Sequence, residues 1–140
     1  MLYVATATVT DDEMAERIAL HRARRPATWR TLEIPTGLAV ALSTLEEVNT
    51  VVVEDLTLLL SNYMERDSST AEENTLHDVQ EVLNMHVNVV LVSNEVGMGV
   101  VPPYPLGRAF RDALGRVNQA AAAQCGEAYF IVAGLPLRIK

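Results

Sequence analysis

Short runs of aliphatic residues alternate with longer amphipathic segments along the whole chain. The runs "TVVVED" at residues 50–55 and "VNVVLVSN" at residues 87–94 are almost continuously apolar, which is typical of parallel strands buried on both faces. "LYVA" at residues 2–5 predicts a further strand, and "AYFIVAG" at residues 128–134 predicts a third buried one. Consecutive parallel strands are usually joined by helices. The alternation therefore predicts an α/β protein with a mostly parallel sheet and helices on both of its faces.

The segments between these runs carry the signals of helices. We expect helices over residues 56–66, 72–86 and 105–125, and a helix that Pro35 opens, with Leu38, Leu42 and Leu45 facing inward. A short strand at residues 29–34 and an edge strand at residues 135–140 complete the pattern. No internal repeat and no linker interrupts it, so we expect a single domain over residues 1–140.

Composition excludes several classes of protein. The formal net charge of −7 argues against general affinity for nucleic acid. No apolar run reaches the roughly 18 residues needed to span a bilayer, and no basic-then-apolar leader begins the sequence. The single cysteine, Cys125, excludes an internal disulfide and fits a reducing compartment, the cytoplasm. Its place in an alanine-rich helix predicts a small core residue.

The segment "TDDEMAERIALHRARRP" at residues 10–26 predicts a helix with a basic end. Thr10 and Glu13 have the spacing of a capping box, and Pro26 ends the helix. Acidic residues at its start and arginines at its end suit the helix dipole. At about 100° per residue, one face carries Met14, Ile18, His21 and Arg25. We expect Met14 and Ile18 to anchor that face to the sheet, and His21 to lie where the buried stripe reaches the sheet edge.

Polar residues follow three of the predicted strands, at the edge of the sheet where ligands of α/β proteins bind. They are "ATAT" at residues 5–8, the pair Glu54–Asp55, and "SNE" at residues 93–95. "VVVED" is similar to a Walker-B element, in which a carboxylate holds Mg²⁺, although any strand can end in an acid. Next to Glu95, the glycines of "SNEVGMGVVP" predict either close backbone approach to a ligand or an ordinary tight turn.

Other charged residues leave the choice between a site and a solvated surface open. One predicted helix carries Arg108, Arg111, Asp112 and Arg116, and the last two have the i,i+4 spacing of an ion pair. His21 is either a surface histidine at a helix end or a nucleophile, because a neutral imidazole can attack phosphorus while neighbouring arginines stabilise the transferred phosphate. His77 and His86 lie on an ordinary amphipathic helix and receive no role, and the histidine spacing suggests no zinc site.

Taken in order, six segments are similar to those of one enzyme family. They are "LYVATA", "DDEMAERIALHRARRPATWRTLE", "LTLLLSN", "VLVSNEVGMGVVP", "FRDALGRVNQ" and "AGLPLRIK". The stretches "HRARRPATW" and "SNEVGMGVVP" are the most specific of them. Over nearly its whole length, the chain resembles the bifunctional adenosylcobinamide kinase / adenosylcobinamide-phosphate guanylyltransferase family of cobalamin biosynthesis.

The resemblance implies a fold, a reaction and a set of residues. Family members resemble RecA-like P-loop nucleotide-binding proteins and are often trimers, so a homo-oligomer is expected. They phosphorylate adenosylcobinamide with GTP or ATP and then transfer GMP from GTP, through a guanylylated histidine, to adenosylcobinamide phosphate, and they need Mg²⁺. The nucleophile then matches His21. The implied nucleotide contacts are Ala5, Thr6, Ala7, Arg22, Ala23, Arg24, Arg25, Glu33 and Glu54, with Glu54 also as the metal residue.

Two features depart from the family pattern. The family begins with a strand and a Walker-A loop, G-x-x-x-x-G-K-S, which is absent here, and the only lysine is Lys140. The chain starts where the family's second strand would start, which suggests a misassigned start, a fragment, or loss of the phosphate-binding loop. An inactive or fragmentary homologue that only binds nucleotide or assembles with other subunits is therefore the alternative. Asp55 stands where relatives more often have a small residue; alternation along a strand separates it from Glu54, which we choose for the metal by register.

Overall fold

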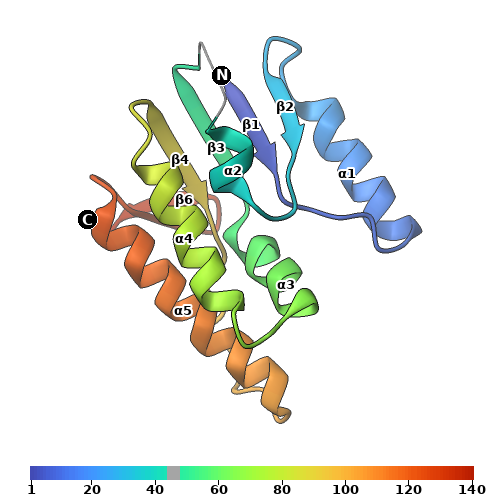
Figure 1. Ribbon diagram of the computed structural model, residues 1–140, viewed down its shortest axis with the longest axis vertical. Helices are drawn as coiled ribbons and strands as arrows, with labels where there is room; N and C mark the ends of the chain where they lie inside the picture. The colour runs from blue at the N-terminus through green and yellow to red at the C-terminus, as the bar shows by residue number, and fades with distance from the viewer. Residues whose placement is uncertain (44–47) are drawn as a thin grey trace.

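A four-stranded parallel sheet forms the centre of the computed structural model, which describes residues 1–43 and 48–140 (Figure 1). Its strands are β1 (Leu2–Ala5), β2 (Arg30–Glu33), β3 (Thr50–Glu54) and β4 (Asn88–Val92), in the order β2-β1-β3-β4. Each neighbouring pair is parallel, which confirms the predicted α/β class. From β1 the chain continues to one side of the sheet, and from β3 to the other. The crevice beyond the ends of β1 and β3 is therefore the expected ligand site.

Helices cover the two faces of this sheet unequally. They are α1 (Asp12–Arg24), α2 (Leu38–Leu42), α3 (Leu56–Arg66), α4 (Ala71–Leu83) and α5 (Pro105–Gln124). Right-handed crossovers place α1 on one face and α2 to α5 on the other, and α1 stands apart from the other helices beside β2 in Figure 1. Leu38 and Leu42 are buried as expected, whereas Leu45 lies outside the described residues.

The main hydrophobic core fills the space between the sheet and helices α2 to α5. Alternate strand residues point into it, and Leu2, Val4, Val51 and Val53 are fully buried there. Their partners on the helices are Leu38, Leu42, Leu56, Leu59, Val79, Val82, Val117 and Ala121. Each large aliphatic side chain of this kind contributes about 1.5–3 kcal/mol to stability. The side chains on this face of the sheet therefore form the hydrophobic core.

Side-chain caps fix where two of the helices begin. The Asp11 side chain accepts a hydrogen bond from the Met14 backbone N–H at 2.7 Å, and Asp55 caps α3 in the same way through Leu58 at 2.7 Å. The predicted capping box at Thr10 is wrong, because α1 begins one residue later with Asp11 as its extended N-cap. Aspartate is as good an N-cap as serine or threonine, so the sequence offered two adjacent caps.

The prediction that β4 is buried on both faces is wrong. Its burial alternates: Val89 and Leu91 are half-buried against the core, whereas Val90 is 49% exposed and Val92 is 37% exposed. Among the helices of the described residues, α1 is the one that lies over the second face, and it lies beside β2, at the opposite edge of the sheet from β4. A run of valines thus predicted the strand but not the number of layers that cover it.

The C-terminal segment also departs from its prediction. β5 (Tyr129–Val132) and β6 (Leu135–Arg138) pair with each other as an antiparallel hairpin, separate from the four-stranded sheet. Tyr129 and Ile131 are more than half exposed, so the expected third buried strand is wrong. The turn residues Ala133 and Gly134 have φ of 51° and 78°, which is the left-handed geometry of a two-residue hairpin turn. Because this turn is so short, β5 pairs with the strand that follows it directly, β6.

Two further expectations concern single residues and membranes. Cys125 is the half-buried C-cap of α5 rather than a core residue. In the described ranges, none of the helices is both long enough and apolar enough to cross a bilayer.

Candidate functional site

Three of the residues implicated by sequence lie in one row across the sheet. Ala5 of β1 is paired in register with Glu33 of β2 on one side and with Glu54 of β3 on the other. Residues paired in register share a face, and alternation puts this face opposite to Val4 and Val53 of the core. The row lies at the carboxyl ends of the three strands. The fold therefore brings Glu33, Ala5 and Glu54 together on the face that α2 to α5 do not cover.

Helix α1 lies over the same face. Its Arg22 guanidinium forms an ion pair with the Glu33 carboxylate. Arg25, which caps the helix, lies with its guanidinium carbon 3.6 Å from the centre of the Tyr3 ring. Tyr3 is two residues before Ala5 in β1 and so shares its face. These two contacts place the last turn of α1 beside the row.

His21 belongs to this last turn and is exposed to solvent. At about 100° per residue, His21, Arg22 and Arg25 all lie within about 60° of Ile18, the middle of the sheet-facing side. Ala23 and Arg24 point away from the sheet by the same geometry. The expected anchor is weaker than the sequence suggested, because Met14 and Ile18 are only half-buried and α1 has no buried residue.

The environment of Arg25 is unusual for a surface arginine. Partial burial lowers the pKa of its guanidinium, the neighbouring charge of Arg22 lowers it further, and Glu33 raises it in opposition. Arginine stays charged in proteins under such shifts. Its Nη1 atom is buried without a hydrogen-bond partner in the described part of the chain. The guanidinium is therefore held against the Tyr3 ring rather than by a network of acceptors.

Thr6 follows β1 and is fully buried. Its hydroxyl donates to the Asp55 carbonyl at 2.8 Å and accepts from the Asp55 N–H at 2.7 Å. Its backbone N–H donates to the Glu54 carbonyl at 3.0 Å, and its own carbonyl accepts from Asn62 Nδ2 at 2.8 Å. Ala7 is next and half-buried. Thr6 thus has its polar atoms engaged with the protein and holds β1 and β3 together at the candidate site.

The adjacent acids Glu54 and Asp55 have different surroundings. Asp55 uses one oxygen to cap α3, and its other oxygen accepts from Asn94 Nδ2 at 3.4 Å. Partial burial raises the pKa of Glu54, and the negative charge of Asp55 raises it further. A carboxylate in this position is stabilised by an incoming cation. Of the two, Glu54 is the acid that remains available at the strand end.

The loop after β4 is held by its own side chains. Glu95 accepts from the Gly97 N–H at 2.6 Å, which favours the tight-turn alternative over a ligand contact. Arg111 donates to the Gly97 carbonyl, and Arg108 donates to the Pro102 and Pro103 carbonyls at 3.1 and 2.8 Å. These two arginines therefore have a structural role.

The spacing of Asp112 and Arg116 allows an i,i+4 ion pair, but Arg116 pairs with a different residue. Arg116 binds the Glu72 carboxylate through two hydrogen bonds of 2.6 and 2.7 Å. Glu72 belongs to the neighbouring helix α4. Asp112 lies at the i,i+4 position on α5, but the Glu72 carboxylate of α4 accepts two hydrogen bonds from the Arg116 guanidinium, which is the stronger arrangement.

Sequence reasoning missed Asn62 and Tyr3, which shape the site, whereas Asn94 belongs to the segment "SNE" that it had placed at this edge of the sheet. Asn62 of α3 ties the Thr6 carbonyl to the Pro35 carbonyl, with hydrogen bonds of 2.8 and 2.9 Å. Asn94 joins β4 to Thr57 at 2.8 Å. Tyr3 supports Arg25. An asparagine inside the apolar segment "LTLLLSN" is a signal that could have pointed to Asn62, whereas a tyrosine in a strand carries no such signal.

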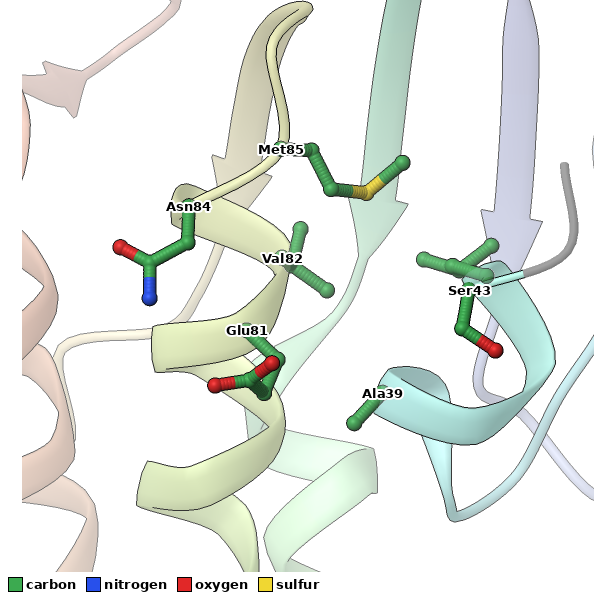
Figure 2. A pocket seen from close by; sticks show the side chains of 7 residues that line it. Ala39, Ser43, Glu81, Val82, Asn84 and Met85 are labelled. Atoms are coloured by element: carbon green, nitrogen blue, oxygen red, sulfur yellow. The ribbon is translucent and has the colours of Figure 1, made fainter. Parts of the chain in front are cut away.

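A cavity and two exposed histidines lie away from this site. A cavity of about 180 Å³ lies between α2 and α4, and Figure 2 shows Glu81, Asn84 and Met85 around it, at the amino ends of the strands and away from Glu54. Within residues 1–43 and 48–140, no three acidic, histidine or cysteine side chains gather as a metal site. His77 and His86 are exposed.

Comparison with known proteins bears on this arrangement. Residues 1–139 match the family described as "Cobinamide kinase / cobinamide phosphate guanyltransferase". The bifunctional adenosylcobalamin biosynthesis protein CobP of Pseudomonas aeruginosa is 44% identical over 140 residues, covering 99% of this chain and 81% of the relative. The CobU proteins of Salmonella typhimurium and Escherichia coli, described in the same words, are 41% and 38% identical, each covering 100% of this chain and 86% of the relative. With these likenesses along the whole sheet and α1, the chain belongs to the cobinamide kinase / cobinamide phosphate guanyltransferase family.

Proposed function

We propose that this chain is a transferase that phosphorylates adenosylcobinamide and then attaches GMP to the resulting phosphate, as a step of cobalamin biosynthesis. The family match and the described activities of its relatives support both reactions over an inactive homologue. The single observation that carries the site assignment is the exposed His21 beside the row of Glu33, Ala5 and Glu54, tied to it by the Arg22–Glu33 ion pair. GTP is the proposed guanylyl donor, and GTP or ATP the phosphoryl donor.

His21 is the proposed nucleophile of the guanylyl transfer. One ring nitrogen attacks the α-phosphorus of GTP; a nitrogen–phosphorus bond forms as the bond from that phosphorus to the bridging oxygen breaks, and pyrophosphate leaves. An oxygen of cobinamide phosphate then attacks the same phosphorus, displaces the imidazole and completes a diphosphate linkage. Covalent catalysis of this kind replaces one difficult displacement by two easier ones. An exposed ring suits it, because two large substrates must reach the same atom in turn.

The charged residues around His21 have a proposed role in holding the nucleotide. Arg22, on the sheet-facing side, binds phosphate oxygens through the planar, two-point geometry of the guanidinium. Arg24 points away from the sheet, so its proposed contact depends on the length of its side chain. Arg22 is paired with Glu33, and both side chains are about half exposed. Exchanging such an exposed pair for a phosphate costs little, because its net strength is about 0–1 kcal/mol. Glu33 is then free to accept hydrogen bonds from the nucleotide.

The remaining proposed contacts come from the strand end and the helix. Ala5, Thr6 and Ala7 form the floor of the nucleotide site at the crevice between β1 and β3, with Thr6 acting through the backbone it supports. The Ala23 side chain points away from the sheet, so its proposed contact with the nucleotide is through its backbone. Arg25 packs against the Tyr3 ring rather than toward the strand end.

Glu54 is the residue that would hold Mg²⁺. Its carboxylate lies at a strand end with a pKa raised by burial and by Asp55, so the side chain fits a divalent cation. Mg²⁺ usually keeps several waters and binds through one or two carboxylates together with the phosphates of a nucleotide, which agrees with a single free acid here. When bound, the ion neutralises charge on the phosphates. Asp55 holds the α3 cap in place beside it.

We also propose a cytoplasmic homo-oligomer, with a trimer as the expected state. The exposed apolar side chains of the hairpin support association, since Ile131, Leu135 and Leu137 are each more than half exposed. A lone cysteine supports a reducing compartment.

The experiment that tests the site is covalent labelling. The purified chain is incubated with α-³²P-GTP and Mg²⁺, and the labelled protein is mapped by mass spectrometry and by its acid-labile, base-stable bond. We expect label on His21, its loss in His21→Ala, and full labelling in His77→Ala, which removes an exposed histidine outside the site. Equal labelling of His21→Ala and the parent protein would contradict the assignment.

A further inference from the structure

The helix that carries His21 has little apolar attachment to the rest of the protein. None of the 13 residues of α1 is buried, and its sheet-facing residues Met14 and Ile18 are only half-buried. Surface helices are normally held by a buried apolar stripe, and their own propensity rarely suffices at this length. Other contacts must therefore fix the helix on the sheet.

The strongest of these contacts lies just behind His21. Arg25 follows the last residue of α1, and its guanidinium carbon lies 3.6 Å from the centre of the Tyr3 ring. Tyr3 is only 6% exposed and belongs to β1 in the middle of the sheet. The Trp29 ring packs against Tyr3, with ring centres 6.3 Å apart. A cation over an aromatic face gains most where water is excluded, so this stack can anchor the helix end.

The hydrogen bonding of Arg25 points the same way. Its Nη1 atom is buried and has no hydrogen-bond partner among the described residues. The exposed ion pair between Arg22 and Glu33 is the other contact of this turn, and it is the one that the proposed function opens when GTP binds. The stack then remains to hold the turn.

We propose that Tyr3 and Arg25 are positioning residues for the guanylyl transfer: their stack holds the last turn of α1, and with it His21, at a fixed place over the sheet while Arg22 engages the nucleotide. Neither residue touches the reacting atoms. The inference rests on the proposed role of His21, but the stack itself can be tested without nucleotide.

The first arm of the test measures the stack in the nucleotide-free full-length chain. The variants are Tyr3→Leu, Tyr3→Phe and Arg25→Ala, and Arg17→Ala is the control because it removes an arginine of the same helix whose ion pair with Glu13 is exposed. Amide hydrogen exchange is followed in residues 19–25. We expect exchange faster by about tenfold in Tyr3→Leu and Arg25→Ala, the order that a desolvated cation–π contact supports, and no change in Tyr3→Phe or Arg17→Ala.

Tryptophan fluorescence provides a second measurement of the same stack in the nucleotide-free chain. Trp29 is the only tryptophan of the chain and packs on Tyr3. Its acrylamide quenching should rise in Tyr3→Leu and stay unchanged in Tyr3→Phe, which keeps the ring. Arg25→Ala leaves the buried strand intact, so it tests the stack even if Tyr3→Leu fails to fold.

The second arm measures single-turnover labelling with α-³²P-GTP. We expect the labelling rate at saturating GTP to fall by about tenfold in Arg25→Ala and Tyr3→Leu, with the half-saturating GTP concentration nearly unchanged, and Tyr3→Phe to restore the rate. If Arg25 bound phosphate, Arg25→Ala would raise the half-saturating concentration while Tyr3→Leu would not.

The outcomes separate the two proposals. Unchanged exchange in Arg25→Ala, or a raised GTP requirement in Arg25→Ala alone, overturns the positioning role. Absence of label from the parent chain contradicts the proposed function, and the exchange and quenching results then still decide whether the stack holds α1.

Discussion

The hydroxyl of Thr6 forms hydrogen bonds with both the backbone N–H and the backbone carbonyl of Asp55. It donates to the Asp55 carbonyl at 2.8 Å and accepts from the Asp55 N–H at 2.7 Å. Through this contact, the end of β1 fixes the position of the residue that caps α3 and of the neighbouring Glu54. A fully buried hydroxyl with both of its bonds made inside the protein supports the site from within.

Replacing Thr6 by valine therefore tests a structural role against a ligand contact. Thr6→Val keeps the shape but leaves the Asp55 N–H unpaired, while the Asp55 carbonyl keeps only its bond from the Leu59 N–H. We therefore expect the free energy of unfolding in urea to fall by about 1–3 kcal/mol. Thr6→Ser keeps the hydroxyl and should lose less. A Thr6→Val protein with parental stability and a raised requirement for GTP would instead place the hydroxyl on the nucleotide.

Replacing Glu54 by glutamine should separate stability from activity. Burial and Asp55 raise the pKa of Glu54, which means that its charged form is disfavoured in the fold; glutamine removes that charge, and we expect an equal or higher Tm. Labelling by α-³²P-GTP should fall by about tenfold or more, since one interaction of about 1.4 kcal/mol corresponds to tenfold in rate.

Asp55→Asn is the matched control for Glu54→Gln. Asparagine keeps the oxygen that caps α3 and is as good an N-cap as aspartate, so Asp55→Asn should retain most of its labelling. Loss of labelling in Asp55→Asn, with full activity in Glu54→Gln, would move the metal role to Asp55.

The contact between Tyr63 and Asp78 predicts a loss of stability in alkaline solution. The Tyr63 hydroxyl donates to the buried Asp78 carboxylate at 2.7 Å, and burial together with this bond raises the pKa of Tyr63 to about 12. Because the pKa is higher in the folded state, this contribution is complete below the ordinary value of 10.0 and is lost as the pH rises through about 12. Urea midpoints of the parent chain should fall across that range more steeply than those of Tyr63→Phe.

The turn of the β5–β6 hairpin predicts a stabilising substitution. Ala133 has a φ of 51°, a left-handed conformation that costs an L-residue about 1–2 kcal/mol, whereas asparagine before glycine is favoured in such turns. Ala133→Asn should slow amide exchange in residues 129–138. Gly134→Ala should speed it, because Gly134 has a φ of 78° and a side chain there is strained although nothing is near it. Equal exchange in both variants would contradict this account.

Local signals were enough to place most helices and strands. The cap at Asp55 and the basic residue Arg66 enclose α3 at the predicted residues, and β1 also has its predicted bounds. These signals act within a few residues of one another, so they can be read from a linear pattern. Where two caps were adjacent, as at Thr10 and Asp11, the boundary moved by one residue.

Only part of the candidate site could be predicted from such local patterns. The helix end with His21 and the acid Glu54 stood out, because nucleophile, arginines and strand-end carboxylate are types that phosphate chemistry requires. The partners of these charged residues could not be predicted from the sequence. Arg116 pairs with Glu72 rather than Asp112, and Arg25 lies on the Tyr3 ring. Each of these pairs joins residues far apart in the sequence, and their meeting depends on how the elements pack.

What the sequence alone determined was the type and order of the elements and the chemistry gathered at the end of α1. Only the tertiary structure decided that β1 lies between β2 and β3, that β5 pairs with β6 rather than with the parallel sheet, and that Glu33 and Glu54 flank Ala5. The physical reason is that helix and turn preferences are set by neighbouring residues, whereas strand partners and buried faces are set by contacts between distant ones. An apolar run indicates that burying the segment is favourable, but it does not indicate which element of the protein will cover it.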